Sequence, residues 1–200
     1  MPSYLALGDS YTIGEAVPAA ENFPHQTTAL LRKQGLQVSE PVIIARTGWT
    51  TGELLDAIRE RALHETFSFV SLLIGVNNQY RGMDISIYKQ ELETLLNLAT
   101  NFANGHARHV FVLSIPDWGA TPFAEGRDRA AVAKEIDAYN TACKAATLAH
   151  KAHWIDITDS TRANAQKPGW LAEDGLHPSG KEYGVWAQRL APGVAAVLKS

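Results

Sequence analysis

Residues 69–78 read FVSLLIGVNN, a short apolar run that passes directly into a polar segment led by glycine. The run Phe69 to Ile74 has the length and the β-branched residues of a strand that is buried on both faces. Such strands are typical of parallel sheets that helices cover on both sides. Four more runs of this kind predict strands of the same sheet: Ser3 to Leu7, Val42 to Ala45, His109 to Ile115 and His153 to Ile157.

Longer amphipathic stretches separate these runs, and this alternation is the signal of βα units in an α/β fold. Helices are expected at Phe23 to Gln34, Gly52 to His64, Ile87 to Ala103 and Arg127 to His150.

A last helix is expected after His177. Thr50 with Glu53, and Ser179 with Glu182, have the spacing of a capping box at a helix start. Pro192-Gly193 should break or kink the last helix and leave Val194 to Lys199 as a short terminal piece.

The bulk composition limits the classes of protein. Two hundred residues without an internal repeat or a low-complexity linker indicate one domain over residues 1–200. No run of 18 apolar residues could cross a bilayer, and a net charge of −3 gives no basic field that would attract nucleic acid. The single cysteine, Cys143, excludes an internal disulfide and is expected to be a packed core thiol.

The start of the chain carries no secretory pattern. Met1-Pro2 runs almost directly into the first apolar segment, without a charged flank or a cleavage-type site. We therefore expect a cytoplasmic protein, although a chain whose leader had been removed would read the same way. The oligomeric state has no signal in the sequence.

Polar, glycine-containing loops follow the first four apolar runs. In open parallel sheets, ligands bind beyond the carboxyl ends of the strands, so we expect the chemistry in these loops. They read GDSY at 8–11, RTGW at 46–49, GVNN at 75–78 and PDWG at 116–119.

Ser10, Asp174 and His177 are the residue types of nucleophilic catalysis. A serine needs an adjacent base, and the base needs an acid that orients it. His177 would take the Ser10 proton and later donate it to the leaving group, while Asp174 would hold the imidazole in the right tautomer. Their three-residue spacing requires a turn, which Gly175 permits.

Four blocks resemble those of the SGNH (GDSL-type) hydrolase family, in the same order along the chain. They are Gly8-Asp9-Ser10, Gly48, Gly75-Val76-Asn77 and Asp174 to Pro178, and they span nearly the whole sequence. The resemblance implies a serine esterase on a three-layer α/β/α sandwich with a five-stranded parallel sheet of flavodoxin-like type.

The resemblance also implies a role for single residues. It implies Ser10, Asp174 and His177 as the triad, and the Ser10 N–H, the Gly48 N–H and the Asn77 amide as donors to the oxyanion. Family members usually carry Asp at the position of Asn78, so we expect altered loop support there rather than lost activity.

Each candidate has an ordinary structural alternative when taken alone. Ser10 would more often be a helix N-cap, Asn77 a turn residue and Gly48 part of a tight turn. Asp9 is expected to brace its loop through bonds to backbone groups, rather than to handle a metal or a phosphate.

No cofactor or metal is expected. The other histidines lack metal-ligand spacing and an acidic partner pattern, and we interpret them as surface or structural residues: His25, His64, His106, His109, His150 and His153. Five side chains near the loops either line an acyl or alcohol pocket or pack in the core or a lid: Trp49, Tyr80, Arg81, Trp118 and Phe123.

The expected substrate is a small, soluble ester with a short acyl group. No amphipathic basic helix is present for stable docking on a membrane. Cleavage of acetyl esters, of general carboxylesters or of thioesters fits the same residues.

Two other interpretations stay open: a metal-dependent phosphohydrolase that holds an ion with Asp9, Asp117, Asp174 and His177, and a binding module that has lost the chemistry. The α/β-hydrolase alternative fails, because the sequence has no Gly-x-Ser-x-Gly elbow.

Overall fold

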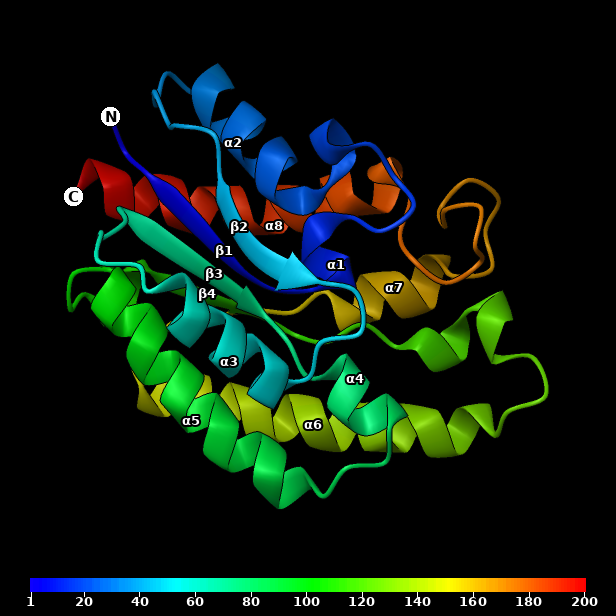
Figure 1. Ribbon diagram of the computed structural model, residues 1–200. Helices are drawn as coiled ribbons and strands as arrows, with labels where there is room; N and C mark the ends of the chain where they lie inside the picture. The colour runs from blue at the N-terminus through cyan, green and yellow to red at the C-terminus, as the bar shows by residue number, and fades with distance from the viewer.

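The computed structural model describes residues 1–200 and contains a five-stranded sheet in the order β2-β1-β3-β4-β5 (Figure 1). Every neighbouring pair of strands is parallel. All five predicted strands form, at β1 (Tyr4–Asp9), β2 (Val42–Arg46), β3 (Phe69–Leu73), β4 (Val110–Leu113) and β5 (His153–Ile155). The predicted fold class is confirmed.

Helices cover both faces of the sheet. Helices α2 (Phe23–Lys33) and α8 (Gly180–Lys199) pack together on one face, while α3 (Thr51–Arg61), α5 (Ile85–Phe102) and α6 (Arg129–Ala149) cover the other (Figure 1). Several short elements lie outside the predicted helical stretches: α1 (Ser10–Ile13), α4 (Val76–Tyr80), α7 (Thr158–Asn164) and the 3-10 turns η1 (Ala19–Glu21), η2 (Ala107–His109), η3 (Trp118–Ala120) and η4 (Pro122–Ala124). None of the helices has the length and apolar character needed to span a bilayer.

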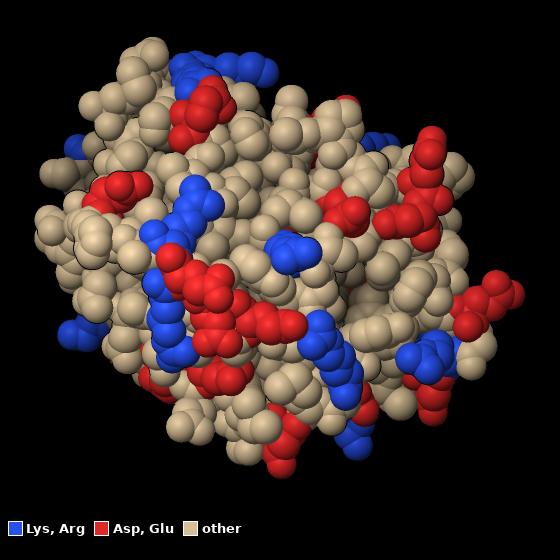
Figure 2. Space-filling view, viewed as in Figure 1, with Lys and Arg blue, Asp and Glu red and all other residues tan.

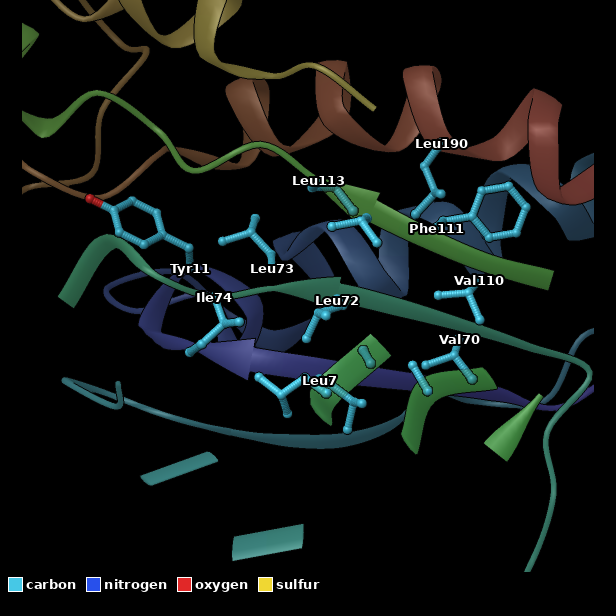
Figure 3. Close-up of a cluster of buried hydrophobic side chains, with 14 of the residues drawn as sticks. Leu7, Tyr11, Val70, Leu72, Leu73, Ile74, Val110, Phe111, Leu113 and Leu190 are labelled. Carbon is cyan, nitrogen blue, oxygen red and sulfur yellow. The ribbon is translucent and has the colours of Figure 1, made fainter. Parts of the chain in front are cut away.

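One cluster of 45 buried hydrophobic side chains fills the space between the layers. Figure 3 shows Phe111 from β4 beside Leu190 from α8, with Leu72 from β3 and Leu7 from β1 farther from that helix. The burial pattern explains why β1, β3 and β4 are almost wholly apolar, since both faces of these central strands are covered. Cys143 is free and buried in this core, as predicted.

The capping box predicted for Ser179 and Glu182 is wrong. Helix α8 does begin after Ser179, but the Ser179 hydroxyl donates to the Gly169 carbonyl at 2.8 Å. The Glu182 carboxylate turns inward and accepts from Ser160 Oγ at 2.7 Å and Trp186 Nε1 at 2.9 Å. A buried carboxylate needs such donors, and they outweigh a bond at the helix start. The Thr50–Glu53 capping box is present as predicted.

The predicted break at Pro192-Gly193 is also wrong, because α8 continues to Lys199. Proline in a helix interior costs about 3 kcal/mol. Here Leu190 and Val194, one turn apart, are wholly buried on the two sides of the proline. Burial of such side chains contributes about 1.5–3 kcal/mol each, which offsets the cost and keeps the helix intact.

The strand order places a crevice at the carboxyl ends of β1 and β3. From β1 the chain moves first to β2 on one side and then to β3 on the other, so the direction of winding reverses at this point. Ligands bind at such switch points in open parallel sheets. Gly8 at the end of β1 pairs with Leu73 at the end of β3, which brings the loops after both strands to one place.

Candidate active site

The turn from β1 into α1 places Ser10 at the first position of a helix. Asp9 is the N-cap, and its Oδ1 accepts from the Tyr11 N–H at 3.0 Å. Asp9 therefore braces the loop, as predicted. Gly8 is required because a Cβ there would lie 2.1 Å from Thr12 Oγ1 and 2.5 Å from the Leu73 carbonyl oxygen. The tight packing against Gly8 lets the chain turn sharply from strand to helix.

The segment from Asp174 to His177 forms the turn that its spacing requires. Gly175 has a φ of +65°, a left-handed conformation that glycine adopts without strain. Asp174 Oδ1 accepts from the Leu176 N–H at 3.0 Å and from the His177 N–H at 2.9 Å. A β-bridge between Leu171 and Pro178, which flank this segment, closes the loop that contains it.

Ser10, His177 and Asp174 lie in one hydrogen-bonded line. His177 Nε2 lies 2.9 Å from Ser10 Oγ, and His177 Nδ1 lies 2.6 Å from Asp174 Oδ2. Ser10 and His177 are buried, and the Tyr11 ring packs against the imidazole at 4.9 Å between centroids. Burial favours a raised pKa for the Asp174 carboxyl, but the bonds from the His177 ring and from two backbone N–H groups lower its pKa overall. Asp174 is therefore ionised at neutral pH.

The loops after β2 and β3 bring Gly48 and Asn77 to the same crevice. Gly48 has a φ of +84°, so it does form a tight turn, and its N–H has no hydrogen-bond partner within the protein. Asn77 lies in the first turn of α4, and its amide donates to the Trp49 carbonyl at 2.9 Å. The second contact of this amide, to Asp9 Oδ2, is long at 3.5 Å.

Asn78 points away from the crevice and is fully buried. Its Oδ1 accepts from the Thr51 N–H at 3.0 Å, and its Nδ2 donates to Thr51 Oγ1 at 2.7 Å. Asn78 thus ties the loop after β3 to the start of α3, which is a loop-supporting position.

A cavity of about 150 Å³ opens beside Ser10 and His177. Its polar lining consists of Ser10, Thr47, Gly48, Asn77 and His177, and its apolar lining of Tyr11, Val76, Tyr80, Trp118, Phe123 and Leu176. Of the five side chains that the sequence left undecided, Tyr80, Trp118 and Phe123 line the cavity. Their rings meet at centroid distances of 5.1 to 6.4 Å.

Trp49 and Arg81 do not line the cavity. Trp49 packs against the core, while Arg81 donates to the Gly48 carbonyl at 2.5 Å and lies 3.3 Å from Glu53. Arg81 thus holds the Gly48 loop from outside. Figure 2 shows acidic and basic side chains interspersed on the face drawn.

Two of the remaining histidines pair with acidic residues at the surface, which is compatible with the structural role expected of them. His150 Nε2 lies 2.6 Å from Glu93, and His25 Nε2 lies 3.9 Å from Glu40. Glu93 and Glu40 are distant in sequence from these histidines, so no short-range spacing in the sequence could indicate the pairs. Neither histidine lines the cavity.

The four residues of the phosphohydrolase interpretation do not converge on one point. Asp117 accepts from Arg162 Nε at 2.8 Å and from the Gly119 N–H at 2.9 Å, so its carboxylate is occupied away from the cavity. No group of three or more His, Cys, Asp or Glu side chains is arranged to hold a metal ion.

Residues 6–185, well over half of the chain, match the GDSL-like lipase/acylhydrolase family. The chain therefore belongs to that family and is a serine ester hydrolase. No curated protein matches the sequence.

Solved structures of related fold cover almost the whole chain. The crystal structure of TesA is 18% identical with a TM-score of 0.75, and the alignment covers 98% of this chain and 99% of that one. A lipase/acylhydrolase from Enterococcus faecalis is 20% identical with a TM-score of 0.75, over 98% of this chain and 96% of that one. An acetyl xylan esterase from Geobacillus stearothermophilus is 20% identical with a TM-score of 0.70, and the alignment covers 96% of this chain and 94% of that one. At these identities the likeness shows the fold.

Proposed function

We propose that Ser10, His177 and Asp174 form a catalytic triad that hydrolyses esters through an acyl-enzyme. The observation that carries the proposal is the position of His177, which bridges Ser10 Oγ and Asp174 Oδ2 within 2.9 and 2.6 Å. When Nδ1 donates to the ionised Asp174, Nε2 is free to accept the Ser10 proton. This is the tautomer that a general base requires.

The reaction then follows from the geometry. Ser10 Oγ attacks the ester carbonyl while its proton moves to His177 Nε2, and a tetrahedral oxyanion forms. His177 donates the proton to the departing alkoxide, which leaves as the alcohol. Water repeats the attack on the acyl-enzyme with His177 again as base, which releases the acid and restores Ser10.

We propose that the oxyanion is held by the Ser10 N–H, the Gly48 N–H and the Asn77 amide. Ser10 is the first residue of α1, so its N–H has no acceptor inside the helix. The Gly48 N–H is also unpartnered, and both residues line the cavity. The Asn77 amide keeps its bond to Trp49 and replaces the long contact to Asp9 with one to the oxyanion.

The cavity supports a small, short-acyl substrate. An apolar cavity of about 150 Å³ accommodates a molecule of roughly the size of benzene. The aromatic and aliphatic lining favours an apolar acyl or alcohol group of that size, in an ester that is soluble in water. Acetyl esters, other short carboxylesters and thioesters are all compatible with this space. We further propose that residues 1–200 act as one domain in the cytoplasm, without nucleic acid, metal or stable membrane association.

The deciding experiment is a panel of esters and thioesters that vary in acyl length and alcohol, run on the wild type and on Ser10→Ala. We expect Ser10→Ala to abolish turnover and labelling by a serine-directed phosphonate, while activity of the wild type survives a strong chelator. The exposed Ser86, on α5, gives the matched control Ser86→Ala. Undiminished turnover by Ser10→Ala would sink the proposal, and loss of activity with the chelator would favour a metal-dependent reaction.

A further inference from the structure

A short chain of hydrogen bonds runs from the β3 side of the crevice to helix α5. It begins with the two bonds between Asn78 and Thr51, and it continues from Thr51 Oγ1, which donates to Glu91 Oε2. Asn78 and Thr51 are fully buried, and Glu91 is half-buried. Three helices, α4, α3 and α5, are thus joined through a single threonine side chain.

Glu91 determines the direction of the two bonds that the Thr51 hydroxyl makes. An ionised carboxylate can only accept, and a hydroxyl has one proton to donate. Because the Thr51 proton points to Glu91, the hydroxyl offers only lone pairs to Asn78, which must present its NH2 group. The Asn78 oxygen is then left to accept from the Thr51 N–H, as observed.

The fold makes room for this carboxylate. Gly52 lies beside it, and a Cβ at that position would come within 2.9 Å of Glu91 Oε1. Thr51 and Gly52 are the first residues of α3, where the helix dipole favours a negative charge. Glu91 lies outside the cavity, so it does not contact a substrate there.

The chain lies directly behind the proposed oxyanion hole. Asn78 follows Asn77, and Thr51 follows the loop that contains Gly48 and Trp49. The bonds between Asn78 and Thr51 therefore fix how far apart the Gly48 N–H and the Asn77 amide lie. The bond from Asn77 to the Trp49 carbonyl joins the same two loops on the cavity side.

We propose that Glu91 is a positioning residue for the oxyanion hole. Through Thr51 and Asn78 it maintains the distance between the two loops that carry Gly48 and Asn77. The inference rests on the proposed roles of Gly48 and Asn77. It predicts that an amide at position 78 needs an acceptor at position 91, and that exchanging the amide and the carboxylate together reverses the two bonds of the Thr51 hydroxyl without losing either.

The test is the exchange of the two groups, one at a time and together. In Asn78→Asp, two carboxylates compete for the one Thr51 proton, and we expect kcat for a small ester to fall roughly tenfold with little change in KM. In Asn78→Asp with Glu91→Gln, the new amide donates to Thr51 Oγ1, which donates to the new carboxylate. We expect this double variant to recover to within about threefold of wild type.

Two controls separate this role from general stability. Glu91→Gln alone should stay within about threefold of wild type, since an amide oxygen can still accept the Thr51 proton. Glu93→Gln, at an exposed position of the same helix, should not rescue Asn78→Asp. Thermal midpoints are measured for all variants. Rescue of the midpoint without rescue of kcat would overturn the proposal, as would a double variant no better than Asn78→Asp.

A second variant covers the case in which Asn78→Asp does not fold. Glu91→Leu removes the acceptor and should lower kcat at least about threefold, while Glu93→Leu leaves it unchanged. Equal kcat values for the two would overturn the proposal. Ser10→Ala is run beside them, because turnover by that variant would refute the triad itself, whereas an inactive Ser10→Ala with no effect at position 91 would refute only the role of Glu91.

Discussion

Asp174 and His177, three residues apart, are joined by two hydrogen bonds that use different oxygens of the carboxylate. The His177 N–H donates to Oδ1 at 2.9 Å, while the ring Nδ1 lies 2.6 Å from Oδ2. Oδ1 also accepts from the Leu176 N–H. One oxygen thus maintains the turn, and the other orients the imidazole, so the two tasks can be separated by substitution.

Asp174→Asn should keep the turn and lose the orientation. The asparagine oxygen can still accept from the backbone, but its NH2 group would face Nδ1 and force the imidazole into the tautomer that cannot take the Ser10 proton. We expect kcat to fall on the order of 10² to 10⁴, with a nearly unchanged thermal midpoint. Asp174→Ala removes both sets of bonds and should lower the midpoint as well. Activity of Asp174→Asn near that of wild type would contradict the proposed triad.

The sequence predicted the sheet well because its strands are short apolar runs that helices cover on both faces. The family blocks led to Ser10, Asn77 and His177, although these residues are brought together only by the strand order and by the turn at Gly175. Distances between them could not be predicted, since 167 positions separate Ser10 from His177.

The errors arise where long-range packing overrides a local pattern. The Ser179–Glu182 spacing is that of a capping box, but the buried donor Ser160, on α7, takes the carboxylate. The sequence also could not distinguish Trp118, which lines the cavity, from Trp49, which packs against the core. Both tryptophans follow strands, and only the packing of η3 against the crevice separates them.

Asn77→Ala should remove one proposed oxyanion donor. Loss of a single side-chain donor of this kind costs on the order of 10² to 10³ in kcat, and we expect an effect of that size. The Trp49 carbonyl also loses its donor, so the thermal midpoint must be measured beside kcat. Asn101→Ala, at an exposed position of α5, is the matched control. A loss of less than about tenfold would refute the role of Asn77.

Phe123→Ala should lengthen the acyl chains that the enzyme accepts. Phe123 is 47% exposed and forms one wall of the cavity, so its removal opens space with little effect on the core. We expect the ratio of kcat/KM for octanoyl over acetyl esters to rise at least about tenfold. The control is Leu148→Ala, another exposed apolar side chain far from the cavity lining. An unchanged ratio would show that the acyl group binds elsewhere.

Asp9→Asn should change how stability depends on pH. Complete burial raises the pKa of the Asp9 carboxyl from 3.8 to about 7, against the lowering effect of the Tyr11 N–H bond. The folded protein therefore keeps a proton that the unfolded chain releases above pH 4. This contribution to stability is fully present below about pH 4 and is lost as the pH rises to about 7.

Asparagine at position 9 cannot ionise, and its side-chain oxygen still accepts from the Tyr11 N–H. Relative to wild type, the free energy of unfolding of Asp9→Asn should thus rise between pH 4 and 8, by on the order of 4 kcal/mol. Other carboxyls, such as Asp174, titrate in both proteins and cancel in the difference. Urea unfolding of both proteins from pH 4 to 8 measures this difference in the free energy of unfolding. A difference that does not vary with pH would mean that Asp9 is ionised throughout.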